Sequence, residues 1–205
     1  MLHQEKKFEY WNHFQYLITK DRAIQIWNIK SGKQIQKLVG HINIVTGVQF
    51  SPDSRYLVSF TCDEPIRLWD IQSGQELKIL DGHINFIRDV KFSHDGQTLV
   101  LSLDDRLIQL WNVNSGKVIL TLIGHSRGVN TAQFSPDDKI IISYSNDNTI
   151  RLWDVKSGQM LHILKIHLNI IKRIKCSSDC NTIASYSNNQ LILWDIKSGK
   201  QMQKL

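Results

Sequence analysis

Long apolar runs and cysteine are both scarce in this chain of 205 residues. No stretch approaches the roughly 18 consecutive apolar residues of a membrane-spanning helix. The first residues, MLHQEKKFEYWNHF, lack the apolar core of a secretory signal. Only three cysteines are present, at scattered positions, so a disulfide framework is excluded as the basis of the fold. These absences predict reduced thiols and an intracellular protein, cytoplasmic or nuclear.

Motifs that carry catalysis or hold a cofactor are also missing. There is no glycine-rich phosphate loop, no EF-hand loop, no His-Glu-x-x-His zinc motif and no G-x-S-x-G nucleophile turn. Cys176 and Cys180 form a single C-x3-C pair, without the second pair that zinc-finger spacing requires. We therefore expect no enzyme, no cofactor and no metal site.

Positive charge is concentrated at the two ends of the chain. Residues 1–40 carry seven Lys or Arg against three acids, and residues 160–205 carry seven against two, whereas the chain as a whole has a formal charge of +6. Such ends would attract nucleic acid, acidic lipid or an acidic protein. The plainer interpretation is that these lysines are solvated residues on strand edges, where they discourage edge-to-edge pairing.

An internal repeat dominates the sequence. Five tryptophans are separated by 42, 42, 42 and 41 residues, and each is followed by Asp or Asn. They are Trp27, Trp69, Trp111, Trp153 and Trp194. Four of them have a histidine 27 or 28 residues upstream, at His41, His83, His125 and His167. A repeat of this length indicates a chain built from copies of one supersecondary unit.

Each repeat contains four short runs rich in aliphatic and β-branched residues. In the second repeat these are IVTGVQF, YLVSF, IRLWDI and QELKIL, separated by the turn-forming segments SPDS, TCDEP and QSG. Several runs are apolar at successive positions, which is typical of strands covered on both faces. The pattern predicts an all-β chain with four antiparallel strands in each repeat. Because the repeat places the basic, apolar segment 165–176 at the first strand of the last unit, we expect it to form a strand. The alternative is an amphipathic helix that binds a membrane or a calmodulin-like protein.

With its Gly-His and Trp-Asp marks, the sequence resembles the WD-repeat β-propeller family. The resemblance implies a propeller of about five four-stranded blades, in one domain. The blades would span residues 1–40 (a degenerate first blade), 41–82, 83–124, 125–166 and 167–205. Because WD-repeat propellers most often have seven blades, three arrangements are open: part of a longer propeller, a closed ring of five blades, or two copies that complete one another.

The resemblance also implies a hydrogen-bonded tetrad of Trp, Ser or Thr, His and Asp in each well-formed repeat. The residues that match are His41, Ser59, Asp63 and Trp69 in one repeat and His125, Ser143, Asp147 and Trp153 in another. Partial sets are His83, Asp105 and Trp111, with Leu101 at the Ser position; Thr19, Asp21 and Trp27; and His167, Ser185 and Trp194, with Asn188 or Asn189 replacing Asp. A Ser-His-Asp trio can also be a hydrolase triad, but its recurrence beside a Trp in a repeat favours a structural role.

Binding is expected on the turns, because loops on a rigid scaffold usually carry recognition. In a propeller, the turn between the second and third strands and the segment before the first strand share one face. The residues that fall there are Asn43, Cys62, Asn85, Asp104, Arg127, Asn146 and Asn169. The expected function is a non-catalytic scaffold or adaptor that binds other proteins or peptides.

Two alternative functions remain open. One is binding of nucleic acid or another acidic ligand through the basic terminal blades. The other is a substrate adaptor of a cullin-type ubiquitin ligase, because IISYSNDNTIRLWDVK (141–156) resembles the docking box of such proteins. That segment ends in Lys156 where the box has Arg, and these two residues are not equivalent at such sites.

Overall fold

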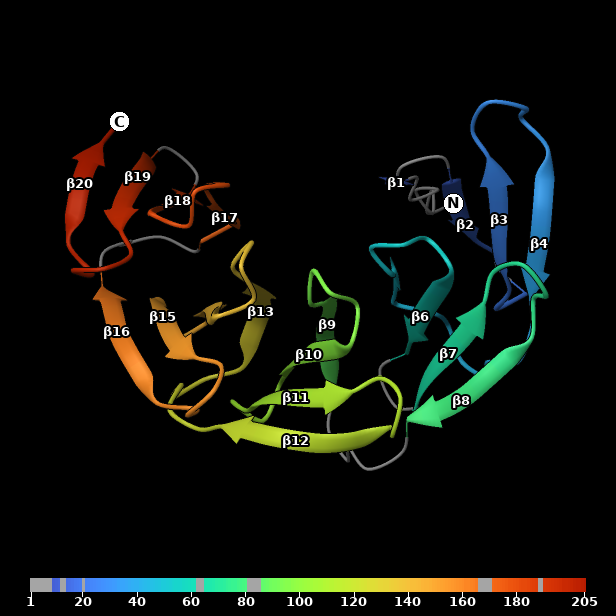
Figure 1. Ribbon diagram of the computed structural model, residues 1–205, viewed down its shortest axis with the longest axis horizontal. Coiled ribbons are helices and arrows are strands. Elements are labelled where there is room, and N and C mark those ends of the chain that lie inside the picture. Colours follow the sequence, from blue (N-terminus) through green and yellow to red (C-terminus); the bar gives the residue numbers. More distant parts are fainter. Residues whose placement is uncertain are drawn as a thin grey trace, which may run out of the picture. The chain divides into compact units, whose positions relative to one another are not determined.

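The computed structural model consists of β-strands joined by turns and loops in the part of the chain that it describes (Figure 1). The described residues are 9–11, 14–19, 21–61, 65–80, 86–165, 171–187 and 190–205. Within these ranges no helix is long and apolar enough to cross a membrane. The prediction of an all-β chain is confirmed, and so is the four-stranded antiparallel repeat, because the strands form five such sheets.

The chain divides into two compact units, Met1–Ile84 and Asn85–Leu205. The first unit holds two sheets. The first sheet consists of β1 (Glu9–Trp11), β2 (Phe14–Ile18), β3 (Ile24–Asn28) and β4 (Gln34–Leu38). The second sheet consists of β5 (Gly47–Phe50), β6 (Tyr56–Phe60), β7 (Ile66–Asp70) and β8 (Glu76–Leu80). In both sheets each strand pairs with the next along the chain.

The second unit holds three sheets of the same topology. The third sheet consists of β9 (Ile87–Phe92), β10 (Thr98–Leu103), β11 (Ile108–Asn112) and β12 (Lys117–Leu122). The fourth consists of β13 (Val129–Phe134), β14 (Ile140–Ser145), β15 (Thr149–Asp154) and β16 (Met160–Lys165). The fifth consists of β17 (Arg173–Cys176), β18 (Thr182–Ser187), β19 (Gln190–Asp195) and β20 (Gln201–Lys204). Of the basic segment 165–176, residues 173–176 form a strand, residue 165 ends β16, and residues 166–170 lie outside the described residues.

Each of the five tryptophans stands at a β-bulge between the third and fourth strands of its sheet. In the fourth sheet, for example, the register shifts between Leu152 and Trp153. The same shift precedes the tryptophan in the other sheets. A bulge re-aims a side chain, and its recurrence explains why the spacing of the tryptophans is so regular.

The Asp or Asn after each tryptophan closes the turn that follows. In the fourth sheet, the Asp154 carboxylate accepts hydrogen bonds from the backbone N–H of Ser157 at 2.7 Å and from its hydroxyl at 2.6 Å. Gly158 then adopts a φ of +69°, which costs glycine little, and its N–H donates to the Asp154 carbonyl at 2.8 Å. The Asx residue of the repeat is thus needed for the turn itself.

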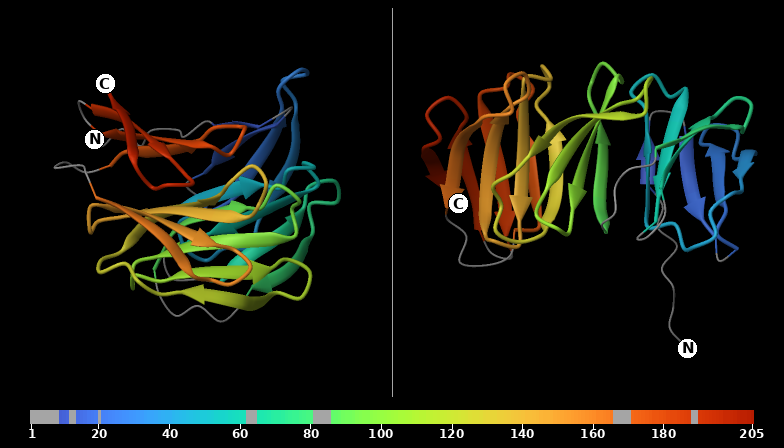
Figure 2. Two further views of the ribbon diagram at one scale, coloured as in Figure 1. Left: turned by 60° about the vertical axis from the view of Figure 1, so that its left-hand side comes forward. Right: turned by 90° about the horizontal axis from the view of Figure 1, so that it is seen from below.

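The turns between first and second strands also repeat one design. The Ser135 hydroxyl donates to Asp137 at 2.6 Å and accepts from the Ile140 N–H at 3.0 Å. Ser51, Ser93 and Ser177 make the equivalent bonds. In the sheets of the second unit, the described turns lie at the two ends of the strands (Figure 2).

The core lies between successive sheets of each unit. Trp153 of the fourth sheet packs with Leu110 and Ile108 of the third, and Trp194 of the fifth packs with Ile142 and Leu152 of the fourth. In the first unit, Trp69 likewise packs with Ile24 and Leu38 of the first sheet. Strands covered in this way read as continuous apolar runs, which explains the pattern seen in the sequence.

Candidate functional site

The fourth sheet contains a complete hydrogen-bonded chain from Trp153 to Asp147. The Trp153 Nε1–H donates to Ser143 Oγ at 2.9 Å, and the Ser143 hydroxyl lies 2.9 Å from His125 Nε2. On its other side, His125 Nδ1 lies 2.8 Å from an Asp147 oxygen. Since the carboxylate only accepts, Nδ1 carries the proton and Nε2 accepts from the serine. Every polar group of the chain is then satisfied with a neutral imidazole.

Asp147 is the anchor of this network. Its carboxylate also accepts the Thr149 hydroxyl at 2.7 Å and the backbone N–H groups of Ser126 and Thr149, both at 3.0 Å. Burial by itself would raise the pKa of this carboxyl, but the bonds from Thr149, His125 and Ser126 outweigh it and lower the pKa to about 2. Burial lowers the pKa of His125, against the opposing effect of Asp147. The pair is therefore aspartate with neutral histidine.

This geometry argues against the hydrolase alternative. Ser143 is fully buried, and its hydroxyl already takes part in the bonds to Trp153 and His125. A nucleophile has to reach a substrate beside an oxyanion hole, whereas this oxygen is enclosed by its own sheet and its neighbour. The Ser-His-Asp trio holds the turn before β13 to the turn between β14 and β15.

The second sheet shows the same inner part of the tetrad. His41 Nε2 lies 2.6 Å from Ser59 Oγ, and the Trp69 Nε1–H donates to that oxygen at 2.8 Å. Both His41 and Ser59 are buried. Asp63, the fourth predicted member, lies outside the described residues.

In the third sheet, leucine replaces the serine and the tryptophan finds another partner. Leu101 is fully buried opposite Gln109, as Ser143 is opposite Arg151 in the fourth sheet. The Trp111 Nε1–H donates instead to Gln109 Oε1 at 3.1 Å. Asp105 is half-buried and accepts the Leu107 N–H at 3.2 Å, while His83 lies outside the described residues.

The first sheet requires a correction. Leu17, not Thr19, occupies the serine position, because Leu17 stands opposite Gln25 as Ser143 stands opposite Arg151. The Thr19 hydroxyl contacts Asp21 and the Ala23 carbonyl, so it closes a turn rather than reaching Trp27. Asp21 in turn pairs with Lys37 at 2.8 Å. Thr19 holds the repeat position of Ser145, which also precedes its aspartate by two residues. The tetrad serine, Ser143, precedes Asp147 by four.

In the fifth sheet the described part of the tetrad is the bond from Trp194 Nε1–H to Ser185 Oγ, at 2.9 Å. Ser185 pairs with Ile192 across the two strands. His167, Asn188 and Asn189 lie outside the described residues.

The predicted binding residues Asp104 and Asn146 belong to one polar row that crosses from the third sheet to the fourth. Asp104 accepts from Arg88 Nε at 2.7 Å, and Arg88 Nη1 donates to Asn130 Oδ1 at 2.8 Å. Asn130 Nδ2 then donates to Asn146 Oδ1 at 2.7 Å. We call these four residues with Arg127 the turn face; the Asn146 amide nitrogen and the second Asp104 oxygen are not used in these bonds.

Arg127 stands beside this row on the segment before β13. Its side chain is exposed and has no hydrogen-bond partner among the described residues, whereas its carbonyl accepts the Ser145 hydroxyl at 2.8 Å. Asn43 is exposed in the second sheet, where it makes a polar or electrostatic interaction. The other predicted binding residues, Cys62, Asn85 and Asn169, lie outside the described residues.

Sequence reasoning missed Arg88 and Asn130, although they link the two sheets. Both open the first strand of a repeat and are 42 residues apart, the repeat period. That equivalence was the available signal. The hydrogen bond between them could not be predicted from the sequence, because Arg88 and Asn130 meet only when neighbouring sheets pack.

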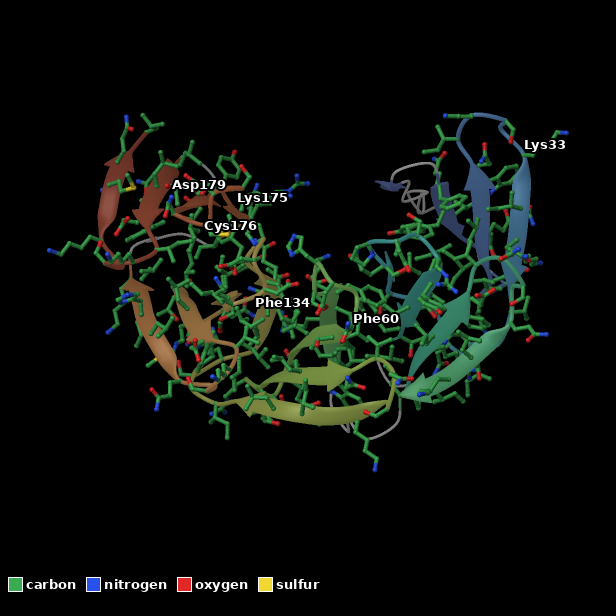
Figure 3. All side chains as sticks on the ribbon, in the orientation of Figure 1. Lys33, Phe60, Phe134, Lys175, Cys176 and Asp179 are labelled. Carbon is green, nitrogen blue, oxygen red and sulfur yellow. The ribbon has the colours of Figure 1, made fainter. Side chains whose placement is uncertain are left out.

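The described residues contain no group of three or more His, Cys, Asp or Glu side chains able to hold a metal ion. Cys176 and Cys180 are free thiols, and burial raises the pKa of Cys176 to about 11. Cys176 takes the strand-end position that Phe134 holds in the fourth sheet (Figure 3). Its surroundings are those of a packed residue rather than a reactive thiol.

Comparison with known proteins agrees with this geometry. A family model described as "WD domain, G-beta repeat" matches residues 32–70, 74–112, 116–154 and 158–195, which is more than half of the chain. The chain belongs to the WD40 repeat family. Each match runs from the end of one sheet to the residue after the next tryptophan, so the fourth-sheet tetrad falls within a single match.

A curated protein described as "Lissencephaly-1 homolog", from Caenorhabditis briggsae, is 43% identical to this chain over 47 residues. The match covers 23% of this chain and 12% of that protein. WD40 repeat domains are generally protein-interaction scaffolds and are typically non-catalytic.

Proposed function

We propose that this chain is a non-catalytic scaffold that binds a protein or peptide through the turn face of its third and fourth sheets. The observation that carries the proposal is the polar row from Asp104 to Asn146, which is exposed and held in place by bonds between two sheets. Binding sites on rigid elements keep their geometry better than sites on free loops. Arg127 adds a charged hydrogen-bond donor whose side chain has no partner among the described residues.

Ser143, His125 and Asp147 form the one Ser-His-Asp trio whose members all lie within the described residues. Their bonding supports a structural role rather than a catalytic one. Their hydroxyl, imidazole and carboxylate satisfy one another and are buried. The residues left for chemistry on the turn face are an ion pair, amides and one guanidinium, which suit recognition of a polar backbone and side chains.

The test is affinity capture with the tagged chain and three variants, followed by quantitative mass spectrometry. Arg127→Ala is the first variant, because its side chain supports no described contact. Asn146→Ala is the second. The control combines Lys117→Ala with Lys139→Ala, at exposed positions at the opposite end of the strands. Proteins bound by the wild type and the control but reduced about fivefold or more by Arg127→Ala support the proposal. An unchanged set of bound proteins in Arg127→Ala and Asn146→Ala contradicts it.

The adaptor hypothesis for residues 141–156 rests on the sequence resemblance alone. This segment forms most of β14, all of β15 and the start of the next turn, and Lys156 is exposed. Its side chain is free to contact a partner, but nothing in its surroundings favours a ligase subunit over another protein.

A further inference from the structure

The first strand of the fifth sheet and the residue before it carry three cations within four residues. Lys172, Arg173 and Lys175 are all exposed, and none has a carboxylate partner within the described part of the chain. We call them the inner cations, because β9, β13 and β17 lie along one side of the second unit and β12, β16 and β20 along the other (Figure 1). Lys175 is labelled on this strand in Figure 3.

The equivalent positions in the other sheets are neutral or compensated. The fourth sheet has Asn130, Thr131 and Gln133 at these positions, 42 residues earlier. In the third sheet they are Arg88, Asp89 and Lys91, where Arg88 pairs with Asp104 and Lys91 lies 3.3 Å from Asp89. The second sheet has Thr46, Gly47 and Gln49. Only in the fifth sheet, among these four, is the charge left uncompensated.

The inner cations are held in place by the fold rather than lying on a free loop. Arg173 and Lys175 belong to β17, which pairs with β18 in regular register. The Lys172 N–H donates to the Tyr186 carbonyl at 2.8 Å, and the Tyr144 hydroxyl of the fourth sheet donates to the Lys172 carbonyl at 3.3 Å. Tyr186 stands directly opposite Arg173 and is 44% exposed, so an aromatic surface adjoins the charges.

From this arrangement we infer that the inner cations bind an acidic, extended segment of a partner protein. Lys172 takes the repeat position that Arg88 and Asn130 hold in the turn face, but the inner cations take no part in the bonds of that row. Arg173 and Lys175 point to the same side of β17 and are separated by about 6.6 Å, two residues of a strand. Acidic side chains at alternate positions of an extended peptide have the same spacing. Such a segment therefore places a carboxylate at each cation, while the Tyr186 ring adjoins its intervening residues.

The same geometry disfavours a nucleic acid as the ligand. The inner cations span about 10 Å along the strand, enough for only one or two phosphates of a single strand. Along the neighbouring sheets, the equivalent positions offer neutral side chains and then Arg88, Asp89 and Lys91, where Arg88 pairs with Asp104 and Lys91 with Asp89. A phosphodiester backbone that continued past the fifth sheet would therefore meet no uncompensated cation at these positions, whereas a short acidic segment needs no further contact.

The test compares two variants with the same change of charge in the same sheet. The first carries Lys172→Gln, Arg173→Gln and Lys175→Gln. The control carries Lys197→Gln, Lys200→Gln and Lys204→Gln, three exposed lysines on or beside β20, of which only Lys197 has a described carboxylate, Asp195, near it. The probes are a fluorescent 12-residue Glu-Ser repeat peptide, the matching Gln-Ser peptide and a 12-nucleotide poly-U RNA. Binding is followed by anisotropy at about 0.15 M salt, with circular dichroism and thermal midpoints as checks of folding.

The Glu-Ser peptide should bind the wild type and the control within about twofold, and the inner variant at least about tenfold more weakly, with the Gln-Ser peptide bound by none of them. Equal weakening by both variants, or no binding of the Glu-Ser peptide to the wild type, overturns the inference. It is also overturned if the RNA binds more tightly than the peptide and depends on the inner cations. Arg127→Ala should leave binding of the peptide unchanged, so failure here and failure of the turn-face proposal are distinguishable.

Discussion

The third and fourth sheets place a buried tryptophan at the same bulge but hold it in different ways. Trp153 donates to a serine that leads on to a histidine and an aspartate, whereas Trp111 donates to Gln109 on its own strand. At the serine position the third sheet has the larger, apolar Leu101. The comparison teaches that the blade requires an acceptor for the indole N–H, but not one particular acceptor. The third sheet relies on packing where the fourth relies on hydrogen bonds.

The largest expected effect that separates the two sheets is that of removing the tryptophan. Trp153→Ala should lower the free energy of unfolding by about 3–5 kcal/mol, through lost packing and because the buried Ser143 oxygen loses its indole donor. The loss of stability for Trp111→Ala should fall at or below the lower end of that range, because its indole N–H bonds to Gln109 rather than to a buried Ser-His-Asp network. Urea unfolding of the full chain measures both. Trp153→Phe, which keeps most of the packing, should lose about 1–2 kcal/mol, and equal losses for the two alanine variants would contradict the comparison.

Truncation to alanine at the serine position should destabilise the protein more in the third sheet than in the fourth, the reverse of the order expected for the tryptophans. Leu101→Ala should lower the free energy of unfolding by about 2–4 kcal/mol, because it leaves a cavity in a fully buried site. Ser143→Ala creates almost no cavity and should lose about 1–2 kcal/mol, the effect of an unpaired indole N–H and imidazole nitrogen. The same urea titration serves for both. If Ser143→Ala proved as destabilising as Leu101→Ala, packing would not be what distinguishes the third sheet.

Acid should weaken the fourth sheet through its buried pair. The folded-state pKa of Asp147, about 2, lies below its ordinary value of 3.8, so the stability it contributes is present above pH 3.8 and is lost as the pH falls toward 2. That contribution is about 2 kcal/mol. The pKa of His125 is also lowered, so protonation of the unfolded chain below pH 6.5 acts in the same direction.

Urea midpoints measured between pH 7 and pH 2 test this. Asp147→Asn should already be less stable at pH 7 and should lose less stability on acidification than the wild type. Parallel pH profiles for the two proteins would show that another group governs acid unfolding.

The smallest effect concerns local opening. Each net hydrogen bond contributes about 0.5–1.5 kcal/mol, so amides of β14 and β15 should exchange more slowly than those of β10 and β11 by a factor of about 2–10. Native-state hydrogen exchange at neutral pH measures this directly. Below about pH 3, where Asp147 begins to be protonated, the difference should shrink. Equal protection of the two sheets at neutral pH would show that Leu101 packing fully replaces the network.

Much of the fold was predictable because its determinants are local. The Asp or Asn after each tryptophan and the glycine four residues after that Asp or Asn specify one turn, and the Ser-x-Asp segments specify another. The inner tetrad members also follow from the repeat, since Ser143 and Trp153 hold fixed positions on paired strands. Thr19 was misassigned because a two-residue offset along one strand keeps the side chain on the same face but moves it away from the tryptophan, to the turn that follows.

By itself, the sequence determined the period, the strand order, the turns and the identity of the residues at each bulge, because these depend on backbone geometry and on contacts within one repeat. Only the tertiary structure decided which acceptor Trp111 uses, that Arg88 meets Asn130, and that the charges of Lys172, Arg173 and Lys175 stay uncompensated while those of Arg88 and Lys91 do not. The physical reason is that partner choice depends on distances of a few ångströms between strands and sheets. Those distances are set by packing, which is not a local property of the chain.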